Sequence, residues 1–149
     1  MERIGLEPGA EVGGYRIVAP LGTGGMGAVY RAADGGGTEV ALKLLHPHIG
    51  ADPAARERLR REVSALQRLR HPRVAAVLDA EADSSEAFIV TELVDGENLT
   101  EHVRSRRPID VLGLAEGLFE VLSAVHAAGV PRLSSSRAAL AQLAADWRR

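Results

Sequence analysis

The stretch LGTGGMGAVY, Leu21–Tyr30, decides the fold, because Gly22, Gly24 and Gly27 stand in it in the order G-x-G-x-x-G. Glycines at this spacing let a backbone approach phosphate closely, since no Cβ stands between the amide groups and the ligand. Several classes of phosphate loop share the pattern, and the residues around it distinguish them.

Two of these classes are excluded by the residues after the last glycine. A dinucleotide fold needs a helix that starts inside the motif, but Gly27 leads into the strand-like run AVYRAA, Ala28–Ala33, and the turn DGGGT, Asp34–Thr38. A Walker loop needs Lys and Ser or Thr directly after its last glycine, and Ala28-Val29 stands there. The remaining class is a glycine loop between two antiparallel strands, which covers a nucleotide and has a lysine on the next strand.

Lys43 is that lysine, and it is the only lysine among the 18 Lys and Arg residues of the chain. It lies in the strand-like run VALKLL, where alternation puts Ala41 on its face and Leu42 and Leu44 on the other. A small residue beside an ammonium leaves room for a flat ligand whose phosphates lie near the amine. The alternative is a solvent-facing lysine on a half-buried strand.

Glu62 is the predicted partner of Lys43. The segment after Asp52-Pro53 reads as a helix up to Arg70. Its apolar stripe contains Glu62 together with Leu59, Val63, Leu66 and Leu69. A carboxylate directed towards a core needs a charged or hydrogen-bonding partner. We therefore predict a Lys43–Glu62 pair, with a glutamate that bends to solvent as the alternative.

The remaining segments predict an α+β fold with an antiparallel sheet of five strands. Two further strands are expected at Val74–Ala80 and Ala87–Leu93, and a short helix at Leu99–Arg106. Asp110 is expected to cap a long helix that ends at Ala127. A last helix is predicted at Arg137–Trp147.

Composition excludes several function classes. The net charge is -2, with both signs spread along the chain, which gives no reason to expect a nucleic-acid partner. No apolar run is long enough to span a membrane, the first residues lack the blocks of a signal peptide, and the absence of cysteine excludes disulfides. We expect a cytoplasmic protein. His46, His48 and His71 are not spaced as a metal site, and loop or capping roles are expected for them.

Four motifs in order, LGTGGMGAVYRA, VALK, REVSALQRLRHPRV and FIVTELVDGENL, resemble the N-terminal lobe of a bacterial eukaryotic-like (Hanks-type) serine/threonine protein kinase. The resemblance covers about Val12 to Val130. It implies a kinase N-lobe at residues 12–97, in which a five-stranded antiparallel sheet packs with the αC helix. Two helices of a partial C-lobe would come next at 98–130, and then a divergent, helical tail at 131–149.

The resemblance assigns roles in ATP binding to matching positions. The glycines would bring backbone amides to the phosphates, Lys43 would hold the α- and β-phosphates, and Glu62 would position it. Val29 and Ala41 would line the adenine slot, with Thr91 as gatekeeper and Glu92 to Val94 as hinge. The full expected set is Leu21, Gly22, Gly24, Gly27, Val29, Ala41, Lys43, Glu62, Thr91, Glu92 and Val94.

The likeness stops where the family carries its catalytic loop, of the form HRDLKPxN. Val130 is followed by PRLSSS, with no aspartate at the position of the catalytic base. Asn98 is the only asparagine, and Asp146, before Trp147, is the only acid after Glu120, so a DFG motif is absent too. The expected catalytic and metal-binding residues are therefore none. ATP binding should be weak, and Mg²⁺ should not be held by this chain.

The sequence thus favours a truncated serine/threonine kinase homologue that binds nucleotide but does not transfer phosphate by itself. One alternative is a non-catalytic, pseudokinase-like module that binds and regulates a partner kinase, and another is a domain that has kept the fold but lost the ligand. The helix at 110–127 is apolar outside a narrow strip that includes Gly117 and Glu120. It is expected to be partly covered by the apolar stripe of the tail and otherwise to mediate self-association or partner binding.

Overall fold

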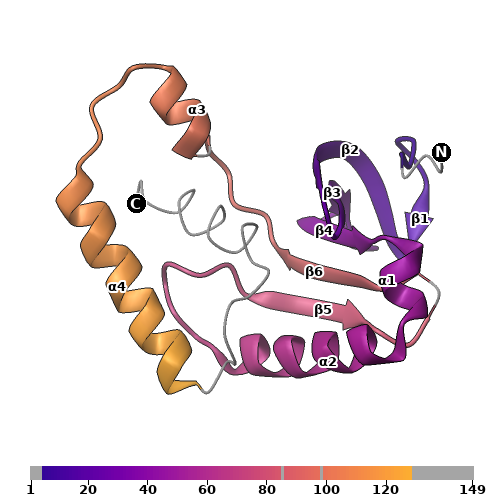
Figure 1. The fold of residues 1–149 in the computed structure, drawn as a ribbon. Coiled ribbons are helices and arrows are strands. Elements are labelled where there is room, and N and C mark those ends of the chain that lie inside the picture. The colour runs from indigo at the N-terminus through magenta and orange to yellow at the C-terminus, as the bar shows by residue number, and fades with distance from the viewer. Residues whose placement is uncertain (1–4, 85, 98, 129–149) are drawn as a thin grey trace. The chain divides into compact units, whose positions relative to one another are not determined.

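The computed structural model describes residues 5–84, 86–97 and 99–128, which fall into two compact units (Figure 1). The first unit comprises Met1–Ser64 and Val77–Leu93, and the second comprises Ala65–Ala76 and Val94–Arg149. The predicted tail helix at 137–147 and its proposed contact with the long helix lie outside the described residues.

The first unit is built on an antiparallel sheet, which confirms the predicted class. Its strands in the described residues are β1 (Glu11–Val12), β2 (Tyr15–Gly24), β3 (Gly27–Ala33), β4 (Glu39–Leu45), β5 (Val77–Glu81) and β6 (Phe88–Glu92), in the order β1-β2-β3-β4-β6-β5. The sheet therefore has six strands where the sequence predicted five. The additional strand, β1, pairs Val12 with Tyr15 across a two-glycine turn, and two residues are too few to give an alternation signal.

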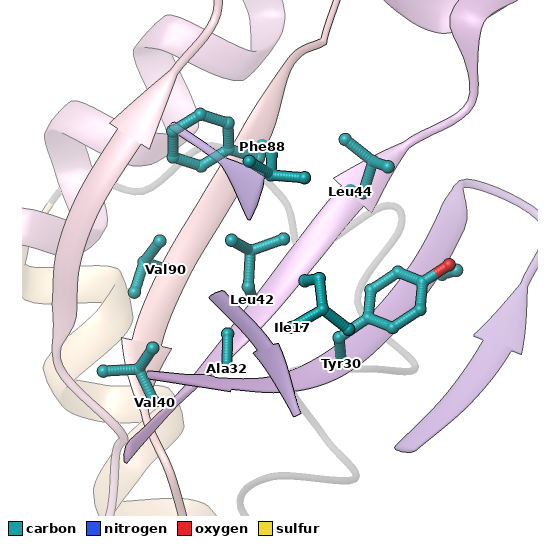
Figure 2. Packing of buried hydrophobic residues seen from close by; sticks show 10 residues of the cluster. Ile17, Tyr30, Ala32, Val40, Leu42, Leu44, Phe88 and Val90 are labelled. Carbon is teal, nitrogen blue, oxygen red and sulfur yellow. The ribbon is translucent and has the colours of Figure 1, made fainter. Parts of the chain in front are cut away.

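One face of this sheet carries the main hydrophobic core, and Figure 2 shows its side chains. Val40, Leu42 and Leu44 of β4 all belong to it, as alternation along the strand predicted. Tyr30, Ala32 and Val90 from the neighbouring strands, together with Ile17, are almost completely buried beside them. Leu42 and Leu44 therefore point to the core face of the sheet, and Lys43, which lies between them in the sequence, points to the opposite face.

Helix α2 (Pro53–Arg68) packs on residues of the other face, after the short helix α1 (Pro47–Ala51). Asp52 starts α2 as predicted, because its Oδ1 accepts a hydrogen bond of 2.9 Å from the Ala54 amide. Leu59 and Val63 of α2 form a second buried cluster with Leu45, Ala82 and Ala87. The predicted stripe of α2 therefore does face apolar partners.

The second unit contains α3 (Leu99–Arg104) and α4 (Val111–Ala127). Asp110 caps α4 as predicted, since its Oδ1 accepts a hydrogen bond of 3.1 Å from the Gly113 amide. Val121 and Val125 form a small core with Leu69.

The strip of α4 that the sequence suggested to be polar or small is partly buried. Gly117 is buried because the guanidinium of Arg73 lies on it, and a Cβ there would come within 3.2 Å of Nη1. The same guanidinium donates from Nε to Glu120 at 3.2 Å.

The rest of α4 exposes large apolar side chains. The exposed fraction is 67% for Val111, 77% for Leu112 and 72% for Phe119. None of the helices in the described ranges is long and apolar enough to cross a membrane.

Candidate nucleotide-binding site

Strand pairing in the first unit brings four of the predicted ATP-site side chains onto one face of the sheet. Val29 of β3 stands opposite Lys43 of β4, and Ala41 of β4 stands opposite Thr91 of β6. Directly opposed residues of an antiparallel pair point to the same side, and residues two apart on one strand do too. The four side chains therefore form a contiguous group on the face away from the main core.

Lys43 is half-buried in this group, and its surroundings shift its protonation. Burial disfavours the ammonium and lowers the pKa of Lys43, while the charge of Glu62 on α2 raises that pKa in part. The described residues form no Lys43–Glu62 ion pair within 4.0 Å, so the attraction acts over a longer distance. The structure thus shows an electrostatic influence of Glu62 on Lys43, but not the direct pair that the sequence suggested.

The three glycines of the motif differ in their surroundings. A Cβ built on Gly27 would lie 2.0 Å from the Leu44 carbonyl oxygen, so this glycine is required by the close approach of β3 to β4. A Cβ on Gly22 or Gly24 would meet no atom within 4 Å, and neither residue has a positive φ. The fold itself therefore does not require Gly22 and Gly24 to be glycine. Open space above their backbone fits a ligand that approaches the amide groups.

The remaining predicted residues lie within β2, at the end of β6 and just after β6. Leu21 is exposed on β2 beside Gly22, and Glu92 is exposed at the end of β6. The hydroxyl of Thr91 donates a hydrogen bond of 3.2 Å to the Glu92 carbonyl oxygen. Ten of the eleven expected residues belong to the first unit, and Val94 belongs to the second.

A further residue at the glycine loop is His46, for which the sequence indicated only a loop or capping role. It holds the N-cap position of α1, yet its side chain makes no capping hydrogen bond. Its Nε2 lies instead 3.0 Å from the Gly24 carbonyl oxygen, and its backbone amide donates to the Met26 carbonyl oxygen at 3.0 Å. Gly24 and His46 are 22 residues apart in the chain, so no local sequence signal could have indicated this contact.

Metal-binding side chains do not gather anywhere in the part of the chain that the structure describes. These residues contain no group of three or more His, Asp or Glu side chains that could hold a metal ion. The side chains on this face of the sheet include the ammonium of Lys43, the guanidinium of Arg31, the hydroxyl of Thr91 and the apolar Val29 and Ala41, a set that suits an anionic ligand with a flat apolar part.

Comparison with known proteins assigns the family. Residues 15–130 match the protein kinase domain. The chain is 37% identical over 130 residues to the probable serine/threonine-protein kinase PkwA of Thermomonospora curvata, a match that covers 84% of this chain and 18% of PkwA. It is 39% identical over 124 residues to the probable serine/threonine-protein kinase PknB of Corynebacterium glutamicum, with 78% of this chain and 19% of that protein covered. The chain belongs to the protein kinase family, and these relatives are bacterial serine/threonine-protein kinases.

A solved structure agrees with this assignment. The PknI kinase domain of Mycobacterium tuberculosis superposes with a TM-score of 0.70 at 32% identity, covering 84% of this chain and 52% of that one. The chain thus spans about half of a kinase domain and about a fifth of the curated relatives. The fold of the two units is that of a kinase N-lobe with the start of the C-lobe.

Proposed function

We propose that the 149 residues bind ATP on the sheet face of Lys43 and do not transfer its phosphate by themselves. The half-buried ammonium of Lys43 carries this proposal. Its charged form is disfavoured by burial, and the core on the opposite face is complete without it. A charge held where it is penalised, beside an open glycine loop, is typical of a binding site for an anionic group.

In this proposal each residue of the group has a defined task. Backbone amides of the loop at Gly22 and Gly24 approach the phosphates, and Lys43 neutralises the α- and β-phosphates while the charge of Glu62 favours its protonated form. Val29 and Ala41 contact the adenine, with Thr91 behind it. Glu92 to Val94 offer backbone groups to the edge of the base. The binding is weak, because the chain supplies few groups beyond these.

The absence of transfer is supported by the sequence. Phosphoryl transfer depends on positioning and on metal ions that neutralise the developing charge. These 149 residues offer no aspartate at the position of the catalytic base, no catalytic-loop asparagine and no DFG aspartate. A chain without these groups retains the means to bind nucleotide but lacks the base and the Mg²⁺ ligands that transfer requires.

Two measurements on the purified 149-residue chain test this function. Isothermal titration with ATP and Mg²⁺ should show binding that is lost in Lys43→Ala, with Arg61→Ala, an exposed cation on α2, as the matched control. Absence of binding in the unaltered chain would refute the nucleotide site. Transfer of radiolabelled phosphate to a generic protein substrate should be at background, and transfer that Lys43→Ala abolishes would refute the second half of the proposal.

A second function is favoured by the exposed apolar side chains of α4. Leu112 and Phe119 are 77% and 72% exposed, and large exposed apolar groups on one helix mark interaction surfaces. We therefore also consider a non-catalytic module that binds a partner kinase or a second copy, in the cytoplasm, through α4. Light scattering after size exclusion should then show self-association or, with a partner kinase domain added, a complex. A strictly monomeric chain that binds no kinase domain would exclude this function.

A further inference from the structure

His46, which follows β4, makes two contacts with the turn of the glycine loop. The loop ends β2 at Gly24 and begins β3 at Gly27, so Gly25 and Met26 form the turn. The ring of His46 contacts the Gly24 carbonyl oxygen at 3.0 Å, and the His46 amide contacts the Met26 carbonyl oxygen at 3.0 Å. One residue beyond the end of β4 thus binds both ends of the turn.

The chemistry of the first contact fixes the tautomer of the ring. A carbonyl oxygen can only accept, so Nε2 of His46 must carry the hydrogen and donate it. The described residues contain no cis peptide bond. In a planar trans peptide the N–H of a residue points opposite to the preceding C=O. By binding the Gly24 carbonyl, His46 therefore directs the N–H of Gly25 away from its own ring.

Residues 22–24 are also held by pairing with β3, in which Gly24 stands opposite Gly27. A Cβ on Gly22, Gly24 or Gly25 would meet no atom within 4 Å, so the space beside these residues is open. Within the described ranges, His46 is the only residue whose side chain donates a hydrogen bond to the backbone of the loop, residues 22–26. The ring of His46 also lies parallel to the ring of His48, with centroids 5.4 Å apart and planes 14° apart, but His48 makes no hydrogen bond to the loop within the described residues.

We propose that His46 is a positioning residue that orients the Gly24–Gly25 peptide and so sets the affinity of the loop for phosphate. The inference rests on the proposed ATP site, because it names which residue holds the phosphate-facing backbone in place. His46 acts through the loop and contacts no reacting atom. Its effect should therefore appear on the phosphates of a ligand and not on its adenosine part.

Three variants of the full chain separate this role from simple folding. His46→Leu removes the donor, His46→Gln keeps an N–H donor at the end of the side chain, and His48→Ala removes the stacking ring but leaves the Nε2 contact. For each variant, ATP and adenosine affinities are measured by titration. Hydrogen exchange of the amides of residues 22–26 is measured without ligand, and urea unfolding reports stability.

His46→Leu should bind ATP roughly three- to ten-fold more weakly, the size expected for one net hydrogen bond, with unchanged adenosine affinity. Its loop amides should exchange faster, and His46→Gln should restore both properties. His48→Ala should stay close to the unaltered chain. Equal ATP affinity and equal loop exchange in His46→Leu would overturn the proposal, as would a loss that His46→Gln does not rescue.

Hydrogen exchange of the loop amides tests the role of His46 separately from the proposed ATP binding. If the unaltered chain binds no ATP while His46→Leu still loosens the loop, the proposed function fails and the anchoring of the loop stands. If the unaltered chain binds ATP and His46→Leu weakens ATP and adenosine to the same extent, the nucleotide site stands and the positioning role fails.

Discussion

Alanine substitutions at Gly27 and Gly24 are expected to act in opposite directions on stability, although both glycines belong to one motif. In Gly27→Ala the new Cβ would lie 2.0 Å from the Leu44 carbonyl oxygen and 2.9 Å from the Leu45 Cα. These are backbone atoms and cannot rotate away, so the pairing of β3 with β4 must open. Overpacking of this kind costs about 3 kcal/mol or more, which for a chain of this size lowers Tm by roughly 10 °C.

In Gly24→Ala the new Cβ meets nothing within 4 Å, and the residue has no positive φ. The substitution then acts mainly by restricting the unfolded chain, which stabilises by about 0.4–1 kcal/mol. Gly22→Ala, where a Cβ also meets nothing, is the matched second variant. Under the proposed function, both should weaken ATP binding while they preserve or raise stability.

The assay is urea unfolding followed by far-UV circular dichroism, with the slope m compared between variants to check that unfolding stays two-state. A Gly27→Ala chain that unfolds at the wild-type midpoint would refute the steric reasoning. A Gly24→Ala chain that loses more than about 1 kcal/mol would refute the claim that the fold does not need this glycine.

Three further predictions concern Lys43, Asp110 and Phe119. Lys43→Met should raise the free energy of unfolding near neutral pH, because it removes an ammonium that burial disfavours. Burial lowers the pKa of Lys43 in the folded state below its ordinary 10.5, so the unfolded chain binds this proton more tightly. The free energy of unfolding should therefore rise as the pH increases towards 10.5. Urea unfolding at several pH values should show that Lys43→Met lacks this rise. Asp110→Ala should cost about 1 kcal/mol through loss of the α4 cap while Asp110→Asn costs little, and equal losses in thermal melts would contradict the capping role. Phe119→Glu, at a side chain 72% exposed, should leave Tm almost unchanged and reduce any self-association seen by light scattering; a large fall in Tm would show that Phe119 is part of a core.

Much of the fold could be predicted because its signals are local. Alternation in VALKLL separated Leu42 and Leu44 from Lys43, and the structure places the two leucines in the main core. The signals that begin helices α2 and α4 are local too, because the side chains of Asp52 and Asp110 accept amide hydrogen bonds in the first turn.

The parts that could not be predicted depend on short elements or on contacts between distant residues. β1 has two residues and α1 has five, lengths at which no periodicity exists. Gly117 is buried because Arg73, far away in the chain, covers it with a guanidinium. At the candidate site, the sequence motif singled out Lys43 and the glycines, but the contact of His46 with Gly24 depends on where β4 ends in space.

The two faces of the β3–β4–β6 sheet have a consequence for protein engineering. The hydrophobic face, with Tyr30, Leu42 and Val90 almost fully buried, holds the strands together. The opposite face carries Val29, Lys43 and Thr91. This face also carries Leu45, which packs with α2, so under the proposed function its residues outside that cluster can be randomised in a library while both buried clusters stay intact. Selection from such a library for analogues with altered bases or fewer phosphates would turn the lobe into a small, cysteine-free biosensor domain that can be labelled at one introduced thiol.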